Sequence, residues 1–187
     1  MTIGTMDIFL LVVIVVSLMV GFFWGAARSL MLLAAWLLAF LMGAYLKLEL
    51  GSYLAREWPE FAASFSEMAA FGVIYMGILL GSPFLIVIST RGSQNLTTYA
   101  VLDDLVGAAF AGSVAILGIA GLVIVMSTFY GVDPVIVDAS GGPEWTASLY
   151  QSLVDSNIGR GIAEQLVPLL GNVLGPILPP DVREVMI

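Results

Sequence analysis

The sequence predicts an all-α membrane protein, and three observations lead to this fold class. Hydrophobic residues make up 60% of the chain and charged residues only 11%, a balance that is typical of proteins embedded in lipid. The mean hydropathy is +1.04. The apolar residues gather in stretches close to the roughly 20 residues that a membrane-spanning helix requires. We place four spans at about 7–24, 28–46, 67–89 and 105–129, followed by short C-terminal amphipathic helices.

The first two spans come from one long apolar run. Arg28 is the only charged residue between Ile8 and Leu46, a segment of 39 residues. As one straight helix, this segment would be about 58 Å long at roughly 1.5 Å per residue, whereas the hydrocarbon core of a bilayer is about 30 Å thick. The segment must therefore turn back. Gly21, Gly25 and Arg28 lie at its midpoint, so we predict a turn at the membrane surface, with a relaxed backbone and an arginine that reaches water and phosphates.

Two acidic residues are placed to cap helices. Asp7 lies at the start of the first span, and Asp103 lies at the start of the fourth, where the positive end of the helix dipole favours a carboxylate. We also expect the first span to be retained rather than cleaved as a signal peptide, because the residues before it include Asp7 and no Lys or Arg.

Small residues lie on the other spans, mostly at four-residue spacing, a pattern that lets helices approach closely in a membrane. They are Ala35, Ala39 and Gly43 in the second span, Gly77 and Gly81 in the third, and Gly107, Ala108 and Gly112 in the fourth. Their recurrence predicts a compact bundle.

The remaining segments are polar or broken. Residues 47–66 predict an interfacial connector with aromatic side chains at headgroup level, and 90–104 predict a polar loop. Beyond residue 130 the chain becomes rich in Gly, Pro and acidic residues. We therefore divide it into a four-span bundle at 1–130 and an extramembranous acidic tail at 131–187. The tail helices are too short to span, so we expect them to lie in the interface or dock on the bundle. In the first, Trp145, Leu149 and Leu153 share one side.

The composition excludes several classes of function. The chain has no His and no Cys, which removes disulfides, thiol nucleophiles, imidazole acid-base chemistry and the usual soft metal ligands. It also lacks a phosphate-binding loop and a dinucleotide fingerprint. We predict no catalytic activity, no metal and no cofactor. With 14 acidic and 6 basic residues and a net charge of −8, the chain is also a poor partner for nucleic acid.

The spans carry no charged residue near their centres, although ion-coupled transporters usually place one there. The polar side chains available at membrane depth are Ser17, Tyr75, Ser82 and Ser113. Each can face the bundle interior or make a hydrogen bond between helices.

Several motifs, in this order and spacing, resemble a known family. They are Met6-Asp7 at the first span, Gly-Phe-Phe-Trp-Gly-Ala-Ala-Arg at 21–28, Trp36 in the second span, Leu-Asp-Asp-Leu-Val-Gly-Ala-Ala-Phe at 102–110, and Thr-Phe-Tyr-Gly-Val at 128–132 followed by Glu144-Trp145. Over roughly 6–155, the chain resembles the colicin V production protein (CvpA) family of small bacterial inner-membrane proteins with four predicted spans. The resemblance implies no catalytic residues.

The resemblance also implies an orientation. Family members carry extra arginines near the 21–28 turn and commonly have one at the position of Asp104, which places the turn and the 90–104 loop in the cytoplasm and the tail in the periplasm. In this chain the basic residues do not decide, because Arg28 and Arg91 would face one side and Lys47 and Arg56 the other.

Two functions of different classes follow. The first is an inner-membrane accessory protein that supports colicin V-like toxin production or secretion, or envelope homeostasis. It would act by contact with the lipid bilayer and with a membrane-protein partner or a second copy. The alternative is a small channel or transporter-like permeation unit formed by an oligomer, since four short spans can line a pore only jointly.

Overall fold

The computed structural model describes residues 4–90, 100–131 and 142–186. All elements in these ranges are helical. In chain order they are α1 (Thr5–Glu57), α2 (Ala63–Ser89), α3 (Ala100–Tyr130), α4 (Glu144–Asp155), α5 (Asn157–Gly161), η2 (Ile162–Leu166), α6 (Val167–Leu174), η3 (Gly175–Ile177) and α7 (Pro180–Met186).

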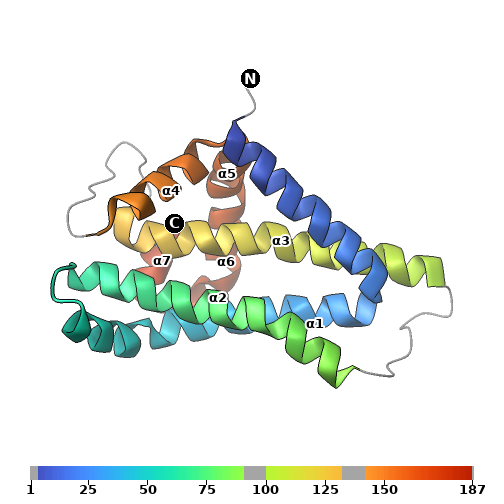
Figure 1. The fold of residues 1–187 in the computed structure, drawn as a ribbon, viewed down its shortest axis with the longest axis horizontal. Helices are drawn as coiled ribbons and strands as arrows, with labels where there is room; N and C mark the ends of the chain where they lie inside the picture. Colours follow the sequence, from blue (N-terminus) through green and yellow to red (C-terminus); the bar gives the residue numbers. More distant parts are fainter. Residues whose placement is uncertain (1–3, 91–99, 132–141, 187) are drawn as a thin grey trace.

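The first two predicted spans are two arms of α1, which is broken at Gly25 (φ 75°, ψ 174°). We call residues 5–24 the first arm and residues 26–57 the second arm. Figure 1 shows the second arm turning back sharply beneath the first. Of the predicted connector at 47–66, residues 47–57 continue the second arm as helix, and a short non-helical stretch at 58–62 leads into α2.

The two arms, α2 and α3 pack around an aromatic core. Phe40 from the second arm and Phe71 and Tyr75 from α2 are fully buried, and the Phe40 ring lies 5.6 Å from the Phe71 ring and 6.2 Å from the Tyr75 ring, between centroids. In the described ranges, α1, α2 and α3 are long and apolar enough to cross a membrane, as expected of a multi-pass membrane protein.

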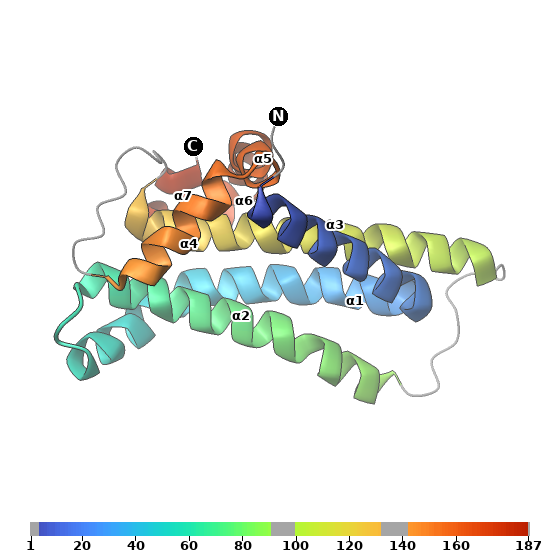
Figure 2. The same ribbon diagram turned by 45° about the horizontal axis from the view of Figure 1, so that its top comes forward.

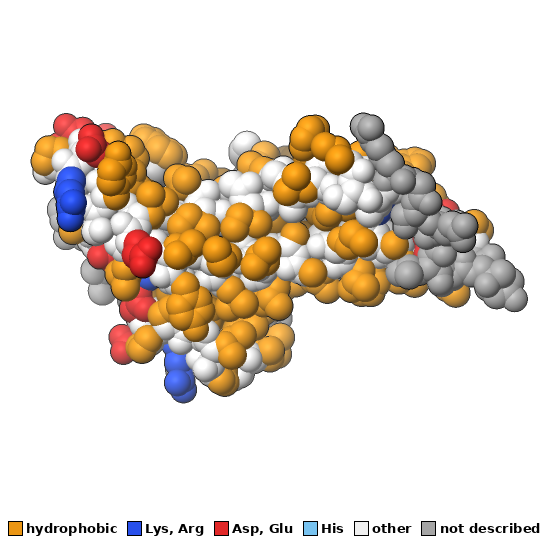
Figure 3. Space-filling view, turned by 90° about the horizontal axis from the view of Figure 1, so that it is seen from below, with side chains coloured by type: hydrophobic (Ala, Val, Ile, Leu, Met, Phe, Trp, Pro, Cys, Tyr) orange, Lys and Arg blue, Asp and Glu red, His pale blue; other side chains and the backbone are white. Residues whose placement is uncertain are grey.

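The outer faces of the long helices are strongly apolar. Leu80, Phe84 and Leu85 of α2 and Val101 of α3 are each more than 60% exposed. Charged side chains gather at the end of the molecule where α1 ends and α2 begins, and the middle of the face seen in Figure 3 is mainly apolar. Water would make such a surface costly, whereas lipid tails are its natural solvent.

The C-terminal helices dock on the bundle. α4, α5 and α7 all contact α3, and α5 also contacts α1; Figure 2 shows them gathered on one side of α3. Val182 and Met186 of α7 are almost fully buried. In α4, however, Leu153 is buried while Trp145 is 68% exposed and Leu149 is 40% exposed. The side chains that α4 buries are therefore centred on Tyr150 and Leu153 rather than on the predicted stripe.

Candidate functional site

The break at Gly25 is held by a carboxylate from another helix. The backbone of Gly25 lies in a region that only glycine adopts readily, and a Cβ there would collide with the Asp103 carboxylate. The break frees the N–H of Ala26 from helical bonding, and this N–H donates to Asp103 Oδ2 at 3.3 Å. Asp103 lies in the first turn of α3, as the sequence indicated. Its side chain, however, caps the second arm of α1.

Next to the break, the first arm and α3 cross at backbone contact. A Cβ on Gly21 would collide with the Gly107 carbonyl and the Ala111 side chain, and a Cβ on Gly107 would lie 2.6 Å from the carbonyl carbon of Gly25. One turn further along α3, a Cβ on Gly112 would lie 2.6 Å from Leu18 Cδ2. These glycines from the predicted turn and the predicted packing stripe therefore meet in one crossing, which their small size makes possible.

The other small residues of the prediction separate into two groups. Ala39 and Gly43 are buried against the bundle, where a Cβ on Gly43 would overlap the Phe71 ring, while Ala35 is half-buried. Ala108 in α3 is also half-buried. Gly77 and Gly81 instead lie on the exposed side of α2, and a Cβ on either would meet no atom of the described part of the chain within 4 Å.

Arg28 joins the turn to the end of α2. Its Nε donates to Thr90 Oγ1 at 2.9 Å, and its Nη2 donates to the Thr90 carbonyl at 3.3 Å. Thr90 is the C-cap of α2 and donates in turn to the Ile86 carbonyl. A cation is favourable at this negative end of the helix dipole. The half-buried Arg28 thus joins the α1 turn to the end of α2, a contact that sequence reasoning did not foresee.

Trp36 and Tyr75 connect three helices at the centre of the bundle. The Trp36 indole N–H donates to Tyr75 OH at 3.0 Å and to the Leu117 carbonyl at 2.9 Å, and Tyr75 OH donates to the Gly118 carbonyl at 3.0 Å. Ser82 and Ser113 instead donate to carbonyls of their own helices. Of the polar side chains noted in the sequence, Tyr75 is therefore one that makes a bond between helices.

Asp7 fixes the beginning of α1 to the tail. Its Oδ2 accepts from Gly4 N–H at 3.1 Å and from the Asn157 side chain at 3.0 Å, and its Oδ1 accepts from Ile158 N–H at 3.0 Å. The residue therefore lies in the first turn of α1 and also binds the first turn of α5. The sequence indicated the first role and gave no sign of the second, since the partners are 150 and 151 residues away.

Two further contacts hold the tail. Lys47 is 4% exposed and pairs with Asp181 of α7. In α4, Tyr150 donates to the Gly131 carbonyl at 2.6 Å. Burial raises the pKa of Tyr150 to about 12, so its hydroxyl keeps the proton that it donates throughout the neutral range.

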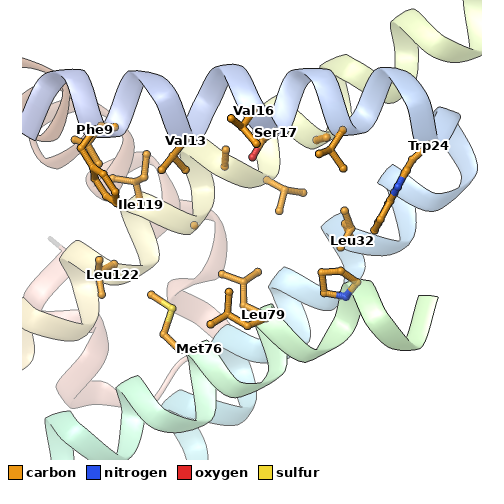
Figure 4. Close-up of a pocket in the computed structure, with 18 residues that line it drawn as sticks. Phe9, Val13, Val16, Ser17, Trp24, Leu32, Met76, Leu79, Ile119 and Leu122 are labelled. Atoms are coloured by element: carbon orange, nitrogen blue, oxygen red, sulfur yellow. The ribbon is translucent and has the colours of Figure 1, made fainter. Parts of the chain in front are cut away.

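An apolar cavity of about 590 Å³ lies between the two arms of α1, α2 and α3. Figure 4 shows Val13, Val16 and Ser17 along one wall and Met76 and Leu79 along the opposite one. Ser17 and the Trp24 indole supply the polar side-chain groups of its lining. The cavity has no acid-base pair, and within the described ranges no three His, Cys, Asp or Glu residues gather in a group that could hold a metal.

Residues 6–159 match the family model described as colicin V production protein. The chain belongs to the colicin V production protein family. The match spans all three long helices and reaches into α5, so it includes the Gly25 break, the Arg28 contact with Thr90 and the Asp7 contact with the tail. No curated protein and no solved structure matched the chain. Family membership suggests a role in colicin V production.

Proposed function

We propose that the protein is an inner-membrane accessory component in the production or secretion of a colicin V-like toxin. It would act by contact with a membrane partner or lipid and not by catalysis. Family membership supports the process. The apolar outer surface supports the location.

The contact between Asp7 and α5 is the observation that carries the membrane arrangement. If α1 crossed the membrane once, the beginning of the chain and the segment after α3 would lie on opposite sides. If each arm crosses, four crossings bring them to the same side, and the bonds from Asp7 to Asn157 and Ile158 require this proximity. The first arm of 20 residues is about 30 Å long, which matches the hydrocarbon core.

The buried charges support action by contact rather than permeation. Asp7 binds α5, Lys47 pairs with Asp181, and Asp103 caps the second arm. Each of these groups holds two parts of the fold together, whereas conduction pathways commonly present charged groups to an aqueous route. The alternative, a channel or transporter-like permeation unit, is tested by measuring solute flux into liposomes that contain the purified protein.

Labelling of single cysteines tests the arrangement, and the cysteine-free chain provides a clean background. Cysteines at Thr5, Ser93 and Ser148 are treated with a membrane-impermeant reagent in intact and in permeabilised cells. We expect Thr5 and Ser148 to react from the periplasm and Ser93 only after permeabilisation. Reaction of Thr5 and Ser148 from opposite sides would refute the four crossings.

Toxin export tests the function itself. A strain that lacks the gene and produces a colicin V-like toxin should regain toxin release when the wild-type chain is supplied. Gly107→Leu, which blocks the crossing with the first arm, should restore little release, and Gly77→Leu on the open face of α2 is the matched control for folding. Full release without the wild-type chain would refute the proposal.

A further inference from the structure

We propose that the apolar cavity binds one acyl chain of an anionic phospholipid, with the phosphate at the Arg28 end. This inference rests on the membrane embedding proposed above and not on the role in toxin production. The cavity touches both arms of α1, α2 and α3, so its occupant would contact every long helix of the bundle.

The lining selects hydrocarbon over water. Its volume of about 590 Å³ lies within the roughly 300–1,000 Å³ of ligand-binding pockets. An ordered water needs two to four polar partners, and the lining side chains offer only the Ser17 hydroxyl and the Trp24 indole N–H. A cavity so poor in polar groups, open at membrane depth, is filled at least cost by the lipid tails around it.

Size and hydrogen bonding exclude a peptide. A membrane-spanning helix about 10 Å wide and 30 Å long occupies about 2,400 Å³, roughly four times the cavity. An extended peptide would bury backbone N–H and C=O groups against this apolar lining without partners, which is unfavourable. An acyl chain has no such groups.

The positive charge of Arg28 at one end of the cavity sets the orientation of the lipid. In Figure 4, Trp24 and Leu32 lie at the opposite end of the cavity from Phe9 and Leu122. Arg28 precedes Leu32 by one helical turn on the same face of α1, and it is half-exposed. The nearby Asp103 carboxylate is directed to the Ala26 N–H on the α3 side, whereas Arg28 reaches toward α2. A phosphate therefore meets a guanidinium with donor capacity beyond its Thr90 bonds.

A pair of glycine variants tests the site by lipid retention. Gly118 lines the cavity, and a Cβ there would lie 3.7 Å from Leu79 Cδ2, so Gly118→Leu fills the space without a backbone clash. Gly77→Leu adds the same side chain where none of the residues that the structure describes lies within 4 Å of a Cβ. Each protein is purified from membranes that contain phosphatidylglycerol and phosphatidylethanolamine, and bound phospholipid is counted by mass spectrometry.

We expect wild type and Gly77→Leu to retain one phosphatidylglycerol per chain and Gly118→Leu to retain about fivefold less or lower still, because the added leucine side chain occupies space that the acyl chain needs. Equal retention in all three proteins, or none in wild type, would overturn the site.

Photo-crosslinking of the unmodified chain provides a second test that no folding defect can obscure. Phosphatidylglycerol with a diazirine on its acyl chain is incorporated into vesicles, and labelled residues are mapped. After tenfold dilution with phosphatidylcholine, label on the outward-facing Val73 and Phe84 should fall about tenfold, whereas label on Leu79 and Ile119 in the cavity should fall less than about twofold, because a specific site stays occupied.

Proportional loss at all four positions would contradict the proposal, as would displacement of the cavity label by an apolar toxin peptide. Either result leaves the topology and toxin-release experiments unaffected, so failure of the lipid site and failure of the proposed function are distinguishable.

Discussion

Replacing Gly25 with alanine is the most direct perturbation of the fold. At φ 75° and ψ 174° a residue with a Cβ is strained by about 1–3 kcal/mol. The added Cβ also collides with the Asp103 carboxylate, and moving that carboxylate breaks its bond to Ala26 N–H, a charged hydrogen bond of about 1.5–3 kcal/mol. We therefore expect Gly25→Ala to lower the free energy of unfolding by about 3 kcal/mol or more.

The assay is titration of mixed micelles with sodium dodecyl sulfate, followed by circular dichroism. Gly131 is the matched control, because its φ is 78° but a Cβ there would meet no atom of the described residues within 4 Å, so Gly131→Ala reports strain without the clash with Asp103. Gly77→Ala, in open helix, reports helix propensity alone. We expect the destabilisation to decrease from Gly25 to Gly131 to Gly77. A Gly25→Ala protein within about 0.5 kcal/mol of wild type would refute this account of the break.

Three further predictions concern polar contacts, all measured by the same titration. Asp103→Ala should cost about 1–3 kcal/mol because it leaves a buried N–H without an acceptor, while Asp103→Asn, which keeps an oxygen, should cost less than half as much. Trp36→Phe and Tyr75→Phe should each cost about 1–2 kcal/mol, and the double variant should cost clearly less than their sum because they share one hydrogen bond; strict additivity would argue against the network. Asp181→Asn should lower the free energy of unfolding by about 1–3 kcal/mol, since it leaves Lys47 buried without its partner charge. It should also speed proteolysis of α7. Adding Lys47→Met should restore protection, and a further loss would contradict the pairing.

The parts of the fold that depend on the lengths of the apolar segments could be predicted from the sequence. The apolar run around Arg28 is too long for one crossing, and two glycines mark the point where it turns, so the return of the chain at Gly25 was predictable. The ends of α2 and α3 lie within five residues of the predicted spans. Local composition determines where these helices begin and end, because the bilayer thickness is fixed and helices must satisfy their own backbone groups.

The contacts between residues far apart in the sequence could not be predicted from it. Lys47 was expected to lie in an interfacial connector, but a carboxylate 134 positions later in the chain makes its burial tolerable, and the second arm continues as a helix. Four-residue spacing of glycines indicated close packing but could not indicate against what. Gly21 and Gly107 meet each other, whereas Gly77 and Gly81 meet no part of the described chain. Which face of a helix finds a partner is a property of the tertiary arrangement.

The bonds between Asp7 and α5 have a consequence for biosynthesis. The Asp7 carboxylate leaves the ribosome 150 and 151 residues before its partners Asn157 and Ile158. During membrane insertion the start of the first arm must therefore wait, with its charge hydrated, until almost the whole bundle has been translated. Docking of α5 then completes the hydrogen bonds of Asp7. A chain terminated before residue 157 would contain all three long helices but would leave Asp7 without Asn157 and Ile158.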